Sequence, residues 1–134
     1  MPVGTLKRRC SATGKSYSRR DIDNLQIIVK YCENIDYFVQ LYGSDEEDFR
    51  ENLPLQYSCV FSLEQIGEQI KHLSSELKTE HQEINWRGAT GLRDKIAHQY
   101  GSMDLSWIRS TVLNDIPFLK TACQNILSSA NKPA

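Results

Sequence analysis

Apolar residues recur at steps of three and four along most of this chain, and that spacing constrains its fold more than any other feature. The first stripe comprises Leu25, Ile28, Val29, Cys32, Ile35, Phe38, Val39 and Tyr42. A helix with this pattern has one apolar face, which must be buried against another element. Segments with the alternating period of a strand, bounded by turn signals, do not occur. The sequence therefore predicts an all-α fold.

Capping and turn residues divide the chain into four or five helices. Gly43 is placed to end the first helix, and Ser44 opens a Ser-x-x-Glu capping box for a short second one. Asn52 can cap the next helix, because Pro54 interrupts the chain there. The expected helices span about 21–42, 44–51, 53–77, 86–98 and 105–127, the last capped by Asp104 and bent at Pro117. Helices joined by such short links predict an up-and-down bundle.

The helix expected over 53–77 has the widest apolar stripe. Its members are Tyr57, Val60, Leu63, Gly67, Ile70, Leu73 and Leu77, with Phe61 and Ile66 widening it. A glycine in mid-helix costs roughly 1 kcal/mol relative to alanine, so Gly67 indicates the close approach of a neighbouring helix. A polar link over 78–83 follows, and Asn85 is placed to cap a helix that starts at Trp86.

Positive charge is concentrated in the first 20 residues, which contain no acid. The basic residues there are Lys7, Arg8, Arg9, Lys15, Arg19 and Arg20. Subtracting these six charges from the formal net charge of −1 leaves −7 on the remainder. Residues 1–17 lack an apolar period, so we expect a flexible arm or a cloning remnant ahead of a single domain over 18–134. Any nucleic-acid contact must be made by that arm or be local, near Arg87, Arg93, Lys95 and Arg109.

Metal, redox and membrane signals are absent from the sequence. The four cysteines, which form no Cys-x-x-Cys pair, are expected to be free and mostly buried: Cys10, Cys32, Cys59 and Cys123. His72 and His81 have no cysteine or carboxylate partner at metal-ligand spacing, so neither is assigned a site. No run of 18 apolar residues occurs. We therefore expect a cytoplasmic protein with neither cofactor nor metal.

The densest group of reactive side chains is Arg93-Asp94-Lys95-Ile96-Ala97-His98-Gln99-Tyr100. On an ideal helix Arg93 and His98 lie about 140° apart, whereas Arg93 and Tyr100 differ by only about 20°. Arg93 and His98 can therefore act on one phosphate if the helix ends near His98, or if a second copy supplies the other half. We expect both, in a twofold dimer with the two segments facing each other.

Other interpretations of this segment stay open. It can be a polar helix end whose histidine is favourably placed in the helix dipole. Asp94 lies four residues before His98, where a carboxylate can accept a hydrogen bond from the imidazole. It can equally pair with Arg87 or Lys95 in solvent, because exposed ion pairs rearrange at little cost.

From Ser18 to Leu127 the chain resembles the HepT family, the DUF86 group of HEPN-domain proteins. The segments that carry the resemblance are Ser18-Arg19-Arg20-Asp21, Gln65-Ile66-Gly67-Glu68, Ile84-Asn85-Trp86, Arg93-x4-His98-x-Tyr100, Asp104-Leu105 and Pro117. The resemblance implies a HEPN-like helical bundle that forms a homodimer with a composite cleft. It also implies the toxin of an MntA/HepT-type, or type VII-like, toxin–antitoxin pair, acting as a metal-independent ribonuclease on RNA.

The same resemblance implies roles for the motif residues. Arg93 and His98 become catalytic, and Tyr100 becomes the acceptor of AMP from an antitoxin of the MNT nucleotidyltransferase type. Asp94 stands where the family often has asparagine, and a carboxylate beside a phosphate site is unfavourable unless it faces His98. We expect Asp94 and Glu68 to support the cleft, and the two other cations of the helix expected over 86–98 to bind substrate: Lys95 and Arg87.

This chemistry needs no metal in principle. An RNA 2′-hydroxyl can attack its adjacent phosphate if a base takes its proton and a cation stabilises the charged transition state. His98 is the expected proton-transfer group and Arg93 the anion-binding group. Two further functions stay open. One is a non-catalytic dimer that binds a nucleotide or accompanies the nucleotidyltransferase, which the acidic body favours; the other is a dimerising bundle without an active site.

Overall fold

The computed structural model describes residues 17–98 and 104–130, without the side chains of Arg93, Ala97 and His98. Its elements are α1 (Arg19–Tyr42), α2 (Glu46–Glu51), α3 (Leu53–Lys71), α4 (Ser75–Glu80), α5 (Trp86–His98), α6 (Leu105–Ser110), the π-helical turn η1 (Thr111–Asp115) and α7 (Ile116–Ala130). No strand occurs in the described ranges. The predicted all-α class is confirmed, with more and shorter helices than the four or five expected.

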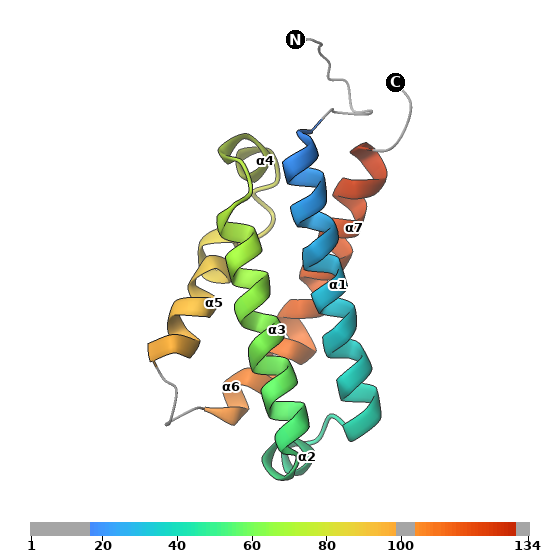
Figure 1. Ribbon diagram of the computed structural model, residues 1–134, viewed down its shortest axis with the longest axis vertical. Coiled ribbons are helices and arrows are strands. Elements are labelled where there is room, and N and C mark those ends of the chain that lie inside the picture. The colour runs from blue at the N-terminus through green and yellow to red at the C-terminus, as the bar shows by residue number, and fades with distance from the viewer. Residues whose placement is uncertain (1–16, 99–103, 131–134) are drawn as a thin grey trace.

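Long helices of alternating direction form the body of the molecule (Figure 1). In this view α1 runs down, α3 up, α5 down and α7 up, as predicted for an up-and-down bundle. α1 packs against α3 and α7, and α3 also packs against α5. The short helices lie at the ends of the bundle, with α4 at the upper end and α2 and α6 at the lower (Figure 1). Across the described ranges, no helix combines the length and apolar character needed to cross a membrane.

The core lies where α1, α3 and α7 meet. The α1 residues predicted to form its inner edge, which include Leu25, Ile28, Cys32 and Ile35, are fully buried. Facing them are side chains from α3, such as Leu63, and from α7, such as Cys123. Burying one large aliphatic side chain stabilises the fold by about 1.5–3 kcal/mol, so this apolar contact is the main cohesive force.

The stripe predicted for α3 was too wide. Leu63, Ile66 and Ile70 are fully buried, but Tyr57 and Phe61 are 63% and 54% exposed. These two rings lie one helical turn apart on the outer side of α3. Periodicity did not separate them from the core, because α3 has apolar residues on two sides.

The helix expected over 53–77 is in fact two helices. α3 ends at Lys71, and α4 begins at Ser75, so the expected link over 78–83 is helical as far as Glu80. Ser74 caps α4, because its Oγ accepts a hydrogen bond from the Leu77 N–H at 3.2 Å. Asp21 of α1 fixes this cap: its carboxylate accepts from the Ser74 N–H at 2.9 Å and the Ser74 hydroxyl at 2.6 Å. A contact across 53 residues thus overrides the apolar spacing.

The boundaries around α2 also differ from the prediction. The cap is Asp45 rather than Ser44, and the Asp45 N–H donates to the Asp48 carboxylate at 3.0 Å. Asn52 precedes α3 as expected, but its side chain donates to the Asp48 carbonyl instead of capping α3. Gly43 does end α1, with a φ of 107° that favours glycine.

The expected bend at Pro117 is a widening of the preceding turn. Across η1 the Ile116 N–H donates to the carbonyl of Thr111, five residues back. Proline has no N–H, and its ring crowds the carbonyl four residues before it, so a wider turn relieves the clash. Asp104 caps α6 as predicted, accepting from the Ser106 N–H at 3.0 Å.

Candidate active site

α5 carries the predicted catalytic segment and has the predicted bounds, Trp86–His98. Asn85 starts it, because its side-chain oxygen accepts from the Gly88 N–H at 3.0 Å. Trp86, Leu92 and Ile96 are buried on the side that packs against α3. The indole N–H of Trp86 also donates to the carbonyl of His81 at 2.9 Å, which fixes the entry into the helix.

Arg93 and His98 both belong to the continuous backbone of α5. Their positions are therefore separated by the five helical residues assumed above, about 140° around the axis and 7.5 Å along it. One α5 does not place both positions on a single face. The side chains of Arg93 and His98, and the whole of Tyr100, lie outside the described residues.

Lys95, one of the residues expected to bind substrate, lies over an aromatic ring. Its Nζ is 4.1 Å from the ring centroid of Trp107 on α6, a cation–π arrangement. Both residues line a groove of about 530 Å³ between α5 and the C-terminal helices, together with Asp115 and Phe118. Positions 93 and 95 are about 160° apart on an ideal helix, so this groove is on the opposite flank from position 93. The sequence held no signal for the pairing of Lys95 with Trp107.

Arg87 and Asp94 are both exposed on α5. Seven residues separate them, which places them on the same side of the helix about two turns apart. Arg109 points elsewhere: its Nε donates to the Ser44 carbonyl at 2.7 Å and joins α6 to the segment before α2. Among the cations considered for substrate contact whose side chains are described, Arg87 is thus the one on α5 that is exposed and away from the groove.

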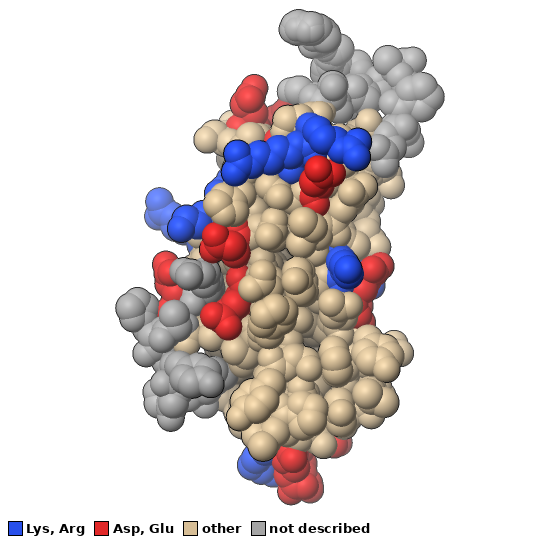
Figure 2. Space-filling view, in the orientation of Figure 1, with Lys and Arg blue, Asp and Glu red and all other residues tan. Residues whose placement is uncertain are grey.

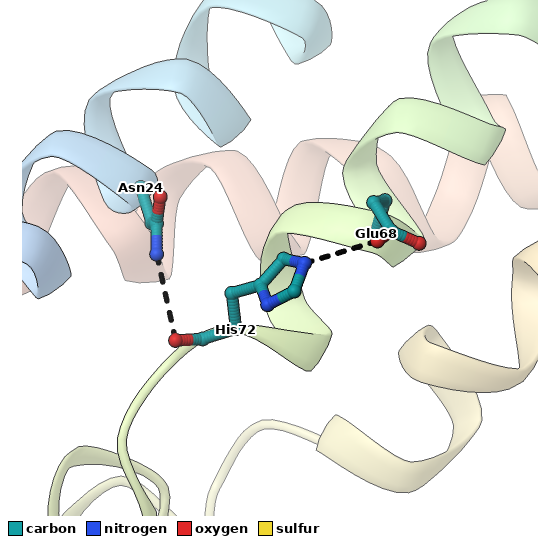
Figure 3. Close-up of polar contacts among 3 residues, drawn as sticks. All are labelled: Asn24, Glu68 and His72. Atoms are coloured by element: carbon teal, nitrogen blue, oxygen red, sulfur yellow. Dashed lines mark hydrogen bonds and ion pairs between the residues drawn. The ribbon is translucent and has the colours of Figure 1, made fainter.

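Glu68 interacts with a histidine to which the sequence assigned no site. Figure 3 shows the His72 Nε2 directed at Glu68, with 3.0 Å between Nε2 and Oε2. The His72 carbonyl accepts from the Asn24 side chain of α1 at 3.5 Å. The sequence analysis assigned His72 no metal site, and this contact is a single pair at the four-residue helical spacing, which is a local signal.

His81, which was also assigned no metal site, has a carboxylate neighbour and a phenol neighbour. Its Nδ1 lies 3.4 Å from Glu83 and its Nε2 lies 2.8 Å from the Tyr17 hydroxyl. Burial raises the pKa of Tyr17, and the negative charges of Asp21 and Glu83 raise it further. These contacts hold the loop that leads into α5. Among the described residues, no group of three or more His, Cys, Asp or Glu side chains is arranged to hold a metal ion.

The three cysteines within the described ranges are free and buried, as predicted. Burial raises the pKa of Cys59 and of Cys123 to about 12, and raises that of Cys32 as well. Such thiols stay protonated at neutral pH and are poor nucleophiles. Cys10 lies outside the described residues.

Residues 24–126 match the family model described as "Ribonuclease HepT-like". The chain belongs to the HepT-like ribonuclease family. The match begins within α1 and ends within α7, so it includes all of α5 and the segment through Tyr100. The resemblance recognised in the sequence is therefore confirmed, and ribonuclease activity is supported at the level of the family.

Several relatives of this HepT-like chain are named as ribonucleases. "Probable ribonuclease HepT" of Thermococcus cleftensis is 39% identical over 98 residues, which cover 73% of this chain and 87% of the relative. "Putative RNase TTE0752" of Caldanaerobacter subterraneus subsp. tengcongensis is 34% identical over 103 residues, covering 77% and 90%. "Putative RNase MJ0125" of Methanocaldococcus jannaschii is 30% identical over 110 residues, covering 81% and 93%. No solved structure matches the chain significantly.

Proposed function

We propose that this HepT-like chain is a metal-independent endoribonuclease and the toxin of a toxin–antitoxin pair. Its antitoxin is an MNT-type nucleotidyltransferase that silences it by attaching AMP to Tyr100. The observation that carries the proposal is the family match, which runs continuously across the Arg93-x4-His98-x-Tyr100 segment. The names of the relatives support the same reaction class.

In the proposed reaction the 2′-oxygen of RNA attacks the adjacent phosphorus, and the 5′-oxygen of the next nucleotide leaves. His98 takes the 2′-proton, the leaving 5′-oxygen takes up a proton from water, and Arg93 binds the non-bridging oxygens as negative charge develops. The products are a 2′,3′-cyclic phosphate and a 5′-hydroxyl. DNA has no 2′-hydroxyl and is not cut. Asp94 and Glu68 are assigned supporting roles.

The spacing along α5 favours a homodimer. Since positions 93 and 98 are about 140° apart on one helix, an Arg93 from one copy and a His98 from the other make a more compact site. Each dimer then contains two composite sites. Arg87 is exposed on α5 and can neutralise a phosphate, whereas Lys95 lies against Trp107 in the groove.

Purified protein incubated with single-stranded RNA tests the activity. We expect Arg93→Ala and His98→Ala each to reduce cleavage at least 100-fold, since general acid–base catalysis alone contributes about 10²–10⁴-fold. Arg20→Ala, at an exposed position of α1, is the matched control and should cut at the wild-type rate. RNA with 2′-O-methyl groups should resist wild type. Equal cleavage by His98→Ala and wild type would refute the proposed chemistry.

Mixed dimers test whether the site is composite. If Arg93 and His98 of different copies meet, a dimer of one Arg93→Ala chain and one His98→Ala chain keeps one intact site. Mixing the two inactive variants should then restore part of the activity. If subunit exchange is verified and the mixture still cuts no RNA, each site belongs to one chain.

The modification of Tyr100 is tested by co-expression with an MNT-type nucleotidyltransferase and mass spectrometry. The Tyr100 phenol attacks the α-phosphorus of ATP, and pyrophosphate leaves. A bulky anion at this position blocks the approach of RNA. We expect AMP on the Tyr100 peptide and none in Tyr100→Phe. An unmodified peptide from an inactive complex would favour inhibition by occlusion instead.

A further inference from the structure

The outer side of α1 and α3 concentrates exposed apolar side chains. Of the six large hydrophobic residues with the greatest exposure in the described part of the chain, five lie here: Tyr37, Leu41, Leu53, Tyr57 and Phe61, at 54–63%. We call these five, with the half-buried Tyr31 and Phe38, the aromatic face. The sixth, Phe118, is on α7. Monomeric proteins rarely expose so much contiguous apolar surface without a binding role.

Ring contacts connect several members of the aromatic face. Tyr31 of α1 and Phe61 of α3 meet edge to face, with 6.0 Å between their centroids, and so join the two helices. Tyr37 meets Phe38 in the same way at 5.3 Å. Edge-to-face packing of this kind is favourable and restrains both rings. The face is therefore a preformed surface.

The two segments that carry the five most exposed members of this surface lack charge. Residues 37–43 and 52–63 contain no charged side chain, in a chain where 25% of residues are charged. Figure 2 shows the result: the lower half of this view is tan, with charged side chains above it and at the lower tip. The nearest acid on α1, Asp36, pairs with Lys120 of α7 at 2.8 Å. RNA finds no cation here to bind its phosphates, and a charged protein finds no complementary charge.

The area fits one protein partner. Large apolar and aromatic side chains have about 150–250 Å² of surface, so five that are slightly more than half exposed offer on the order of 600 Å². A stable interface takes about 800 Å² from each partner. In a dimer with a twofold axis, the same surface of each copy faces the other. A second copy therefore presents an apolar, uncharged surface that matches this one.

We infer that the aromatic face is the docking surface for a second copy of this chain. This inference rests on the homodimer of the proposed function and states which surface forms it. α3 carries part of the face and also packs against α5, which ends beside the middle of α3 (Figure 1). A twofold contact through the face therefore places both α5 ends near the interface, where a composite site requires them.

The oligomeric state of the full chain, measured by sedimentation equilibrium, tests the inference. We expect wild type to be a dimer, and Phe61→Glu and Tyr57→Glu to raise the dissociation constant at least 100-fold. Phe118→Glu is the matched control, because Phe118 is as exposed as Phe61 but lies on α7. It should remain dimeric. Unchanged helical circular dichroism in all variants shows that they fold.

Three outcomes would overturn the inference: a monomeric wild type, dimeric Phe61→Glu and Tyr57→Glu, or a dimer broken only by Phe118→Glu. RNA cleavage by the same samples separates this inference from the proposed function. If Phe61→Glu is monomeric but wild type cuts no RNA, the docking surface stands and the ribonuclease proposal fails. If wild type cuts RNA while the face variants stay dimeric, the ribonuclease proposal stands and the docking surface is wrong.

Discussion

The two ends of α1 differ in how their side chains are satisfied. At the first turn, Asp21 is buried at 3% exposure and accepts two hydrogen bonds from Ser74, so the chain closes this end itself. In the last two turns, Tyr37 and Leu41 are 61% and 57% exposed. One helix thus goes from a buried carboxylate to exposed apolar side chains.

The difference shows what holds each region in place. A buried carboxylate is tolerated only with directional partners, so the contact between Asp21 and Ser74 fixes where α4 starts relative to α1. Exposed apolar side chains need no directional partners. Their burial stabilises a structure by about 25 cal/mol per Å², and only when a partner removes them from water. The upper end is specified within one chain, whereas the lower end is available for assembly.

The largest loss of stability should come from removing the contact between Asp21 and Ser74. Asp21→Ala removes both hydrogen bonds to Ser74, and bonds to a charged group are worth roughly 1.5–3 kcal/mol each, so we expect the free energy of unfolding to fall by about 3 kcal/mol. Urea denaturation measures it. Asp23→Ala is the control, because Asp23 pairs with Arg19 in solvent at 3.2 Å and should matter by no more than about 0.5 kcal/mol. Equal effects would mean that Asp21 does not hold the upper end.

Local signals in the sequence predicted much of this fold. The inner residues of α1, the bounds of α5 and the caps Asn85 and Asp104 follow from spacing and side-chain chemistry within one turn. The pairing of Glu68 with His72 had the same kind of local signal and was overlooked. Motif residues Arg93 and His98 were placed correctly on one helix, but only their backbone positions are described.

Contacts between distant segments were not predictable in this way. The break between α3 and α4 depends on Asp21, 53 residues earlier, while Leu73 and Leu77 continue the helical spacing across it. Lys95 lies on Trp107 only because the fold brings this ring of α6 against α5. Spacing along one helix carries no information about such neighbours.

A smaller change in stability with pH tests whether water is excluded from the interior beneath the exposed rings. Cys59 is fully buried two residues before Phe61, and burial raises its pKa to about 12 from 9.0 when exposed. A thiol with a raised pKa stabilises the fold fully below pH 9, and the stabilisation is lost as pH rises from 9 towards 12. Each pKa unit is worth about 1.4 kcal/mol, so wild type should lose about 1 kcal/mol more than Cys59→Ala between pH 8 and pH 10. Identical losses in the two proteins would indicate that water reaches the interior beneath the aromatic face.

The smallest effect should come from Leu41, which the monomer leaves exposed. Leu41→Gln keeps helix propensity, so in the monomeric Phe61→Glu background it should change the free energy of unfolding by no more than about 0.5 kcal/mol. The same substitution at the fully buried Leu25 is the matched control and should cost at least about 3 kcal/mol, because it places an amide in the core. In the wild-type background, Leu41→Gln should instead weaken the dimer. A loss above about 1 kcal/mol in the monomer would show that α1 packs its last turns against its own chain, and the contrast between its two ends would disappear.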